Sequence, residues 1–244
     1  MSWHRMSRKY HKWLMLFVGI QFLIWSISGA YMVIFDIDYI HGDSLVVNHQ
    51  TPLESEQINY SIAKLHTDYP NAKNIELTNI LGSAVYRFSD GNSKNLLSAD
   101  TGNSLSPINE EYAVLIAKNL YDHANATIKE VSLIASKPPF ELSARHLPVW
   151  RVDFDDFVSP SFYISVNSGE LVTKRHIFWR LFDWMFSFHV MDYIEEDASN
   201  KLLLVVMLLA LIASLFGLVL TYFRVFKQVG KNSSKQKQKV RRAV

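Results

Sequence analysis

The sequence predicts an α+β membrane protein in which two transmembrane helices flank a folded polar segment. Two observations predict this class. Runs without Asp, Glu, Lys or Arg occupy 13–35 and 202–223, near opposite ends of the chain. The polar segment between them repeats the order helix, strand, hairpin, strand. Each half is therefore expected to form one helix on a three-stranded antiparallel sheet, a small pair of packed layers.

The two apolar runs are long enough to cross a bilayer. As helices they would be about 33–35 Å long, against a hydrocarbon core of about 30 Å. The small residues Ser28, Gly29 and Ala30 also fit the cleavage site of a signal peptide. The first apolar run is, however, longer than the usual apolar region of such peptides. We therefore expect 13–35 to be an uncleaved transmembrane helix and 202–223 to be the second one.

Basic residues beside the two runs indicate the orientation. Residues 1–12 carry four basic residues and 224–244 carry eight, and neither segment contains an acid. Basic flanks stay in the cytoplasm. Both termini are therefore expected to be cytoplasmic, with 36–200 outside. The tail 224–244 lacks apolar periodicity and is expected to be disordered, its charges favouring anionic lipid rather than nucleic acid.

The composition and motifs narrow the chemistry. The chain has no cysteine, which excludes disulfides, thiol catalysis and cysteine-ligated zinc or iron–sulfur clusters. The sequence contains no Gly-x-Ser-x-Gly, no His-Glu-x-x-His and no Gly-rich phosphate loop. We therefore expect a non-enzymatic protein with no catalytic residues and no dedicated metal site.

The polar segment is expected to contain two similar units, 44–107 and 108–175. Residues 98–105 match 165–172 at an offset of 67, each reading as a strand that enters an Asp/Asn-Thr/Ser-Gly turn. The Asp or Asn can bond its own backbone there, and Gly supplies a positive φ. Upstream, 84–88 resembles 148–152.

Periodicity gives the remaining elements of each unit. Helices are expected over 55–69 and 109–123, the second with Asn109 as its N-cap. The expected strands are 74–78, 84–88, 95–99, 128–134, 149–154 and 161–166.

The helix–sheet unit that ends in a strand and Asp100-Thr101-Gly102 is similar to PepSY domains. Residues 8–13, running on to Ser28-Gly29, resemble the first helix of PepSY-associated transmembrane proteins. The resemblance covers most of 8–225 and implies a bacterial inner-membrane protein with periplasmic PepSY units. Some PepSY units resemble peptidase inhibitors or pro-segments, and larger four-helix relatives are associated with haem and with reduction of siderophore-bound iron.

The resemblance and the missing catalytic motifs together favour a non-enzymatic binding or accessory module anchored in the membrane. Its partner would be an unidentified membrane or periplasmic protein. Two alternatives stay open. One is a haem-binding electron-transfer subunit that assists the reduction of ferric chelates. The other is a regulator of a peptidase.

Residues 176–191 form a further amphipathic segment. Polar residues recur there at helical spacing, with apolar and mostly aromatic residues between them. We expect a helix at the outer membrane surface, or a re-entrant hairpin with the second span. The polar residues of the stripe are His176, Arg180, Asp183 and Ser187.

His189 falls opposite that stripe, among aromatic residues. It is expected either to bond a backbone carbonyl or Asp192, or to be an axial ligand of haem b. A second ligand would be His41, or His189 of a second copy. His11 matches the histidine near the start of the first helix in the resembled family. It is expected to lie at the cytoplasmic side, where it either ligates a second haem or contacts lipid headgroups.

Small residues mark one face of the second apolar run. Ala210, Ala213, Ser214 and Gly217 lie close together on a helix and allow close approach of another helix. This pattern predicts that the two spans pack against each other or that the chain forms a homodimer.

Overall fold

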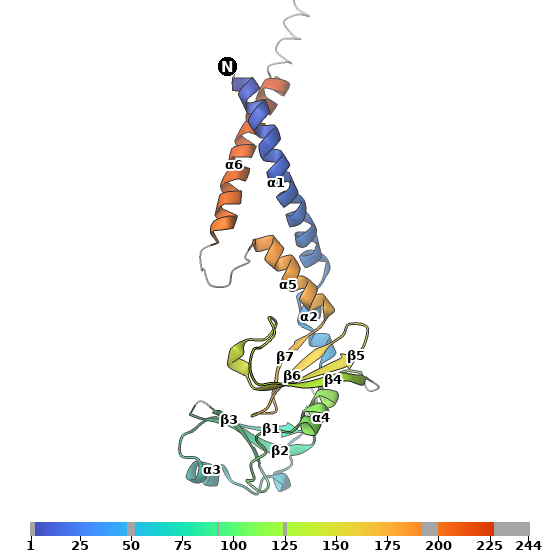
Figure 1. Cartoon of the computed structure of the whole chain (residues 1–244). Helices are drawn as coiled ribbons and strands as arrows, with labels where there is room; N and C mark the ends of the chain where they lie inside the picture. The colour runs from blue at the N-terminus through green and yellow to red at the C-terminus, as the bar shows by residue number, and fades with distance from the viewer. Residues whose placement is uncertain (1–2, 48–51, 92, 124–125, 192–199, 227–244) are drawn as a thin grey trace, which may run out of the picture. The chain divides into compact units, whose positions relative to one another are not determined.

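The structure is a computed structural model that describes residues 3–47, 52–91, 93–123, 126–191 and 200–226. It divides into two compact units (Figure 1). Unit 1 comprises Met1–Ile34 and Asp183–Val244, and unit 2 comprises Phe35–Phe182. Within the described residues the fold is α+β, with two candidate membrane-spanning helices and two antiparallel sheets. The expected tail lies outside the described residues from residue 227 onward.

Unit 1 contains the two candidate spans. They belong to α1 (Trp3–Ile34) and to α6 (Lys201–Thr221), which a π-helical turn, η4 (Tyr222–Phe226), extends. By length and composition, Met6–Ile34 and Lys201–Arg224 can each cross a membrane. Helix α1 begins before residue 13, because Arg and Lys favour helix and neither Gly nor Pro interrupts the basic segment.

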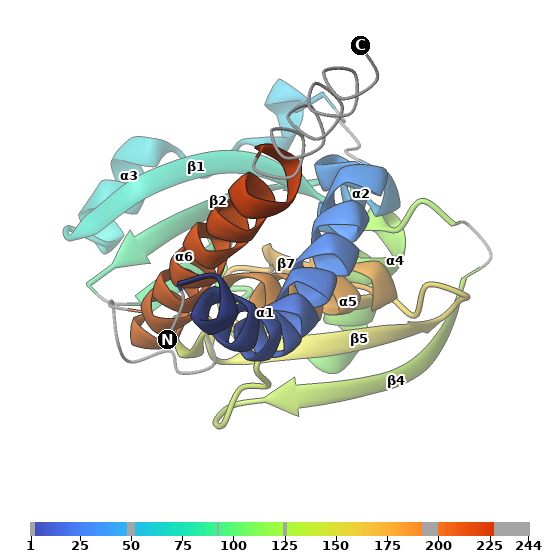
Figure 2. The ribbon, with the colours of Figure 1, turned by 90° about the horizontal axis from the view of Figure 1, so that it is seen from above.

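The prediction that the spans pack together is confirmed. Helices α1 and α6 meet near the start of α1 and diverge toward α5 (Ile177–Val190) (Figures 1 and 2). Tyr10 of α1 stacks on Phe216 of α6, with ring centroids 6.1 Å apart. Ala213, one of the small residues, is buried. The face of α6 that carries the small residues therefore contacts α1 of the same chain.

Unit 2 contains both sheets. The first has the order β1-β2-β3, and the second has the order β4-β5-β6-β7. The strands are β1 (Ala72–Ile80), β2 (Ser83–Asp90), β3 (Ser93–Ser98), β4 (Thr127–Ile134), β5 (Val149–Asp155), β6 (Ser161–Ser165) and β7 (Leu171–Arg175). The helices and 3-10 turns are α2 (Ile37–His41), η1 (Asp43–Leu45), η2 (Ser55–Gln57), α3 (Ile62–Asp68), α4 (Glu110–Leu120), η3 (Ala144–His146) and the first turns of α5 (Ile177–Val190).

The two repeated halves share one core. Figure 1 shows α4 between the two sheets. Alternation along the strands sends Val85 of β2 and Phe162 of β6 into the cluster that surrounds Ile116 of α4. The other face of the first sheet, including Tyr86, packs in a second cluster that also contains Leu65 of α3. The halves are therefore joined by buried apolar surface rather than by a linker.

The matching turns of the two halves have the same geometry. Gly102 and Gly169 have φ values of 74° and 60°. Their amides donate to the carbonyls of Ser98 and Ser165, at 2.9 and 3.0 Å. The Oγ atoms of the same two serines accept from the residues before each glycine, at 3.2 Å. The positive φ is thus confirmed, but serine rather than Asp or Asn makes the side-chain bond.

Three expectations about the elements are corrected. The second sheet has four strands, because 171–175 returns through the Gly169 turn and pairs with β6. The helix expected over 55–69 is split into η2 and α3, because Ser61 caps α3 through the amide of Lys64. The helix expected from residue 176 begins at Ile177. Asn109 caps α4 through the amide of Tyr112, as predicted.

Candidate functional site

The imidazole of His189 lies against α1 inside unit 1. Its Nδ1 is 2.8 Å from Oγ of Ser28. Ser28 Oγ in turn donates to the carbonyl of Ile24, at 2.8 Å. If that bond uses the hydroxyl proton of Ser28, Nδ1 of His189 donates to Oγ. In the neutral imidazole that donates from Nδ1, the lone pair is on Nε2.

The backbone around His189 is fixed as well. Trp25 Nε1 donates to the carbonyl of His189 at 2.7 Å, so the last turn of α5 is bonded to α1. A Cβ at Gly29 would lie 3.6 Å from Cε1 of His189. The imidazole of His189 therefore lies against α1 at Gly29, where the helix has no side chain. The alternative partner Asp192 lies outside the described residues.

His11 has the same arrangement near the other end of α1. Its Nδ1 is 2.9 Å from the carbonyl oxygen of Ala213 on α6. A carbonyl only accepts, so Nδ1 carries a proton, and in the neutral imidazole the lone pair is then on Nε2. A Cβ at Gly217 would lie 3.1 Å from Cε1 of His11, tighter than ordinary contact. The glycine therefore lets the ring lie flush against α6.

An open cavity adjoins His11. Its volume is about 560 Å³, which is within the range of about 300–1,000 Å³ typical of small-molecule and cofactor sites. Apolar residues of α6 line it together with small polar ones, and Arg224 adds a basic side chain to the lining. The lining residues are His11, Ser214, Gly217, Leu218, Leu220, Thr221 and Arg224.

His41, the expected partner of His189, belongs to unit 2 and is exposed. Its ring lies 4.8 Å from the ring of Trp179, measured between centroids. The guanidinium of Arg175 also lies over the ring of Trp179, with Cζ 3.7 Å from the ring centroid. The two histidines lie in different units, so their pairing on one haem stays a prediction.

His176 is buried and structural. Its Nε2 lies 2.9 Å from the carbonyl of Ile40, which fixes α2 beside the start of α5. Burial lowers the pKa of His176, and the nearby Arg180 and Arg175 lower it further, although its bonds to backbone act in the opposite direction. His176 is therefore neutral, and its bond to Ile40 gives it a structural role. His176, the first residue of the expected polar stripe, lies one residue before the start of α5.

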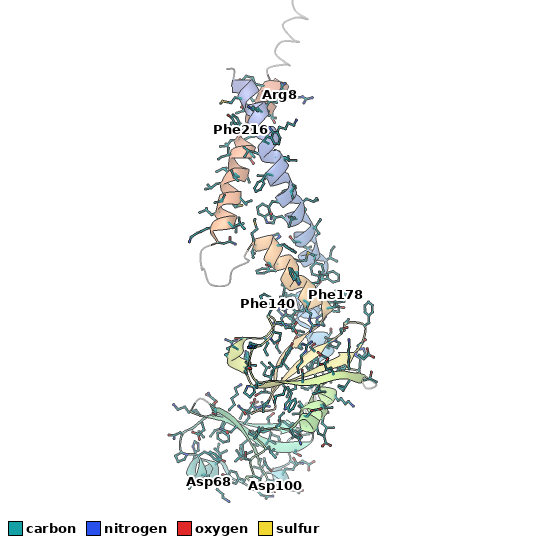
Figure 3. All side chains as sticks on the ribbon, in the orientation of Figure 1. Arg8, Asp68, Asp100, Phe140, Phe178 and Phe216 are labelled. Atoms are coloured by element: carbon teal, nitrogen blue, oxygen red, sulfur yellow. The ribbon has the colours of Figure 1, made fainter. Side chains whose placement is uncertain are left out.

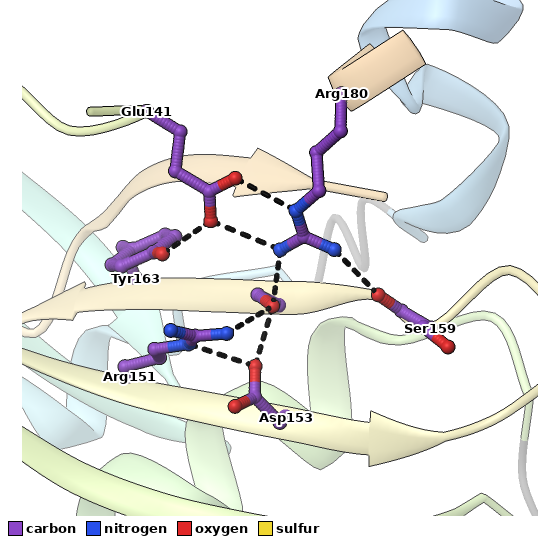
Figure 4. Close-up of polar contacts among 7 residues, drawn as sticks. Glu141, Arg151, Asp153, Ser159, Tyr163 and Arg180 are labelled. Atoms are coloured by element: carbon purple, nitrogen blue, oxygen red, sulfur yellow. Dashed lines mark hydrogen bonds and ion pairs between the residues drawn. The ribbon is translucent and has the colours of Figure 1, made fainter. Parts of the chain in front are cut away.

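Arg180 is the centre of a polar cluster on the sheet face opposite α4 (Figure 4). Its Nε and Nη2 donate to the two carboxylate oxygens of Glu141, at 2.7 and 2.9 Å. Nη2 also donates to Ser161 Oγ at 2.7 Å, and Nη1 donates to the carbonyl of Ser159 at 3.1 Å. Tyr163 donates its hydroxyl to Glu141. The cluster fixes the first turns of α5 to β6 and to the loop before β5.

The protonation states in this cluster are settled by its contacts. Burial raises the pKa of Glu141, but the bonds from Arg180 and Tyr163 lower it more, so the net shift is downward. Burial and the Glu141 carboxylate raise the pKa of Tyr163. A carboxylate bonded on both oxygens by one guanidinium is a poor base. The cluster is therefore built for holding α5 rather than for proton transfer.

Sequence reasoning missed Glu141, because no periodicity or motif marks it and its partner Arg180 is 39 residues away. Two acids that follow the first span make contacts within the fold. Asp36 caps α2 and Asp43 pairs with Lys174 at 2.7 Å. In the part of the chain that the structure describes, no group of three or more His, Asp or Glu side chains could hold a metal ion.

Comparisons with known proteins give no further assignment. No family model, no curated protein and no solved structure matches the chain. The resemblance to PepSY-associated transmembrane proteins therefore stays a prediction that rests on the residues quoted above.

Proposed function

We propose that the protein is a membrane-anchored accessory subunit that holds haem beside its spans and presents a PepSY-like unit outside a bacterial inner membrane. One observation carries the proposal. Nδ1 of His11 and Nδ1 of His189 each lie within hydrogen-bond distance of an oxygen of the helical framework, and a neutral imidazole that donates from Nδ1 keeps a lone pair on Nε2. Histidines that ligate metals are almost always held in this way by a second partner.

The residues present fit a haem group. Imidazole nitrogen is a preferred axial ligand of haem iron. The cavity beside His11 has the volume of a cofactor site, with Leu218 and Leu220 as apolar wall. Arg224 in its lining would pair with the carboxylates of the group. Bound haem would supply one-electron transfer, and the chain's own residues would hold and orient it.

The two histidines would serve different haem groups. His11 and Ser28, the partner of His189, are seventeen residues apart on α1, which is about 25 Å along a helix. One chain thus offers one imidazole near each end of the span. A homodimer would bring a second copy of each, and helical bundles commonly bind cofactors between facing helices. This arrangement supports a dimer of two-span chains.

The orientation of the proposal follows from the basic flanks of both spans, which favour cytoplasmic termini. His11 would then lie near the cytoplasmic face and His189 near the outer face. Unit 2 would be the periplasmic part. A ferric chelate as electron acceptor stays a prediction, as does regulation of a peptidase as a different role for the outer unit.

Visible absorption spectroscopy of the full chain, purified in mild detergent from haem-replete cells, tests the proposal. We expect a Soret band whose intensity falls in both His11→Ala and His189→Ala and is lost in the double variant. His66→Ala, on the exposed surface of α3, is the matched control and should keep the full band. Light scattering should give the mass of a dimer.

A folded but colourless protein would refute the proposal. Folding is judged from the far-ultraviolet circular dichroism of the same sample, so that loss of haem is separated from loss of structure. A Soret band that persists in the double variant would refute the assigned ligands.

A further inference from the structure

We propose that two loops of unit 2, around Phe140 and Phe157, insert their phenylalanine rings into the outer surface of the membrane that α1 and α6 span. The loops would be a second contact with lipid, separate from the spans. The inference does not depend on haem.

The two rings are the most exposed phenylalanines among the described residues. Phe140 is 84% exposed and Phe157 is 87% exposed. A single exposed apolar side chain is ordinary, but two such rings on loops that contact the start of the same helix indicate an interaction surface. Phe140 follows Pro138 and Pro139, which restrict the backbone before it and so lower the cost of presenting the ring.

Both loops are bonded to the first turns of α5. Glu141, next to Phe140, receives the two bonds from Arg180. In the second loop, the carbonyls of Val158 and Ser159 accept from Ile177 and Arg180 at 2.9 and 3.1 Å. The two loops are therefore held against the first turns of α5.

The start of α5 adds further apolar surface. Ile177 is 50% exposed and Leu181 is 39% exposed. Figure 3 places Phe140 and Phe178 at one end of unit 2 and Asp68 and Asp100 at the other. The apolar side chains thus gather where α5 begins, and labelled acids lie away from it.

The same end of unit 2 is the one joined to the first span. That span ends at Ile34, and the ring of Phe35 packs on Phe178 with centroids 5.3 Å apart. Tyr39 packs on Phe178 at the same distance. The chain therefore enters unit 2 within one residue of the span, beside the start of α5. Aromatic residues favour this depth of a membrane.

Charge around the Phe140 loop favours lipid as the occupant. Lys137 and Arg145 are exposed on this loop, and its acid Glu141 is already neutralised by Arg180. Exposed basic residues are attracted to anionic headgroups. Phe157 follows Asp155 and Asp156, so contact at that loop would rest on the ring rather than on charge.

The absence of cysteine from the sequence makes the test direct. Phe140→Cys, Phe157→Cys and Ile62→Cys are made singly in the full chain and carry a nitroxide spin label. Ile62, on α3, is 52% exposed and serves as the matched control. The variants are placed in nanodiscs of phosphatidylcholine and phosphatidylglycerol, and collisions with oxygen and with a water-soluble nickel chelate are measured.

We expect a higher ratio of oxygen to nickel collisions at 140 and 157 than at 62, because oxygen concentrates in hydrocarbon and the chelate in water. Equal ratios at the three positions in nanodiscs would overturn the proposal. A low, water-like ratio of oxygen to nickel collisions at 140 and 157 in nanodiscs, together with fewer nickel collisions at these positions in native membranes, would also overturn the proposal. A protein partner would then cover the loops.

Discussion

Glu141 and Arg180 form a two-bond ion pair that connects the loop before β5 to the first turns of α5. Their side chains are 13% and 31% exposed. Bonds of this kind fix geometry as well as energy, because the planar guanidinium matches both carboxylate oxygens. The pair therefore fixes the first turns of α5 to the loop before β5.

Removing one member of this pair should destabilise the protein. Arg180→Ala would leave the largely buried Glu141 without its counter-charge, and we expect the free energy of unfolding to fall by about 2 kcal/mol. Lys94→Ala is the control, because the Lys94–Glu170 pair has the same 2.7 Å distance but side chains 54% and 41% exposed. That change should cost less than about 1 kcal/mol. Equal losses in denaturant unfolding would contradict the distinction.

Acid should weaken unit 2 through His176. Its pKa is lower in the folded chain than in the unfolded chain, so the unfolded chain binds more protons below about pH 6.5. The contribution of His176 to stability is therefore complete above that pH and is lost as pH falls toward the folded pKa. Denaturant unfolding between pH 8 and pH 5 measures the slope. His176→Asn, which can still donate to Ile40, should flatten it, and the exposed His66→Asn should not.

The turns at Gly102 and Gly82 should differ in their tolerance of a methyl group. A Cβ at Gly102 would lie 2.4 Å from the ring of Tyr60, whereas a Cβ at Gly82 would meet nothing within 4 Å. Both residues have positive φ. Gly82→Ala should therefore cost about 1–2 kcal/mol for backbone strain alone. Gly102→Ala should cost about 1–3 kcal/mol more for overpacking. Thermal unfolding of the two variants compares these costs, and equal losses would show that the Tyr60 ring moves aside.

Local chemistry explains what the sequence could predict. The Asn109 cap, the positive φ of both turn glycines and the two long apolar helices depend on neighbouring residues alone. Each of these was predicted correctly. Helix α1 begins at Trp3, before the apolar run, because absence of charge locates a bilayer core and not the end of a helix.

Contacts between distant residues explain what could not be predicted. β7 is short and ends in Lys174 and Arg175, so only its pairing with β6 identifies it as a strand. Helical spacing placed His176 and Arg180 on one polar stripe, but their partners Ile40 and Glu141 come from other elements. The hydrogen bonds of His189 and His11 depend likewise on helix packing that periodicity does not encode.

Gly217 should control the site at His11. A larger side chain there would displace the ring, because even a Cβ would approach Cε1 to 3.1 Å. We expect Gly217→Leu to lower the haem content of the purified chain, measured as the ratio of Soret to protein absorbance. Gly19→Leu is the matched control on α1, where a Cβ meets nothing within 4 Å. Equal haem content in the two variants would contradict the role of His11.

Ser28 should tune the site at His189 without being a ligand. Ser28→Ala removes the acceptor of the Nδ1 proton, so the imidazole becomes less basic and freer to rotate. We expect a shifted reduction potential and weaker retention of haem. Ser26→Ala is the control, because Ser26 bonds the carbonyl of Phe22 in the same helical manner but is exposed. A potential that stays unchanged in Ser28→Ala, with haem bound, would mean that His189 is held only for packing and that the ligand at this end of the span lies elsewhere.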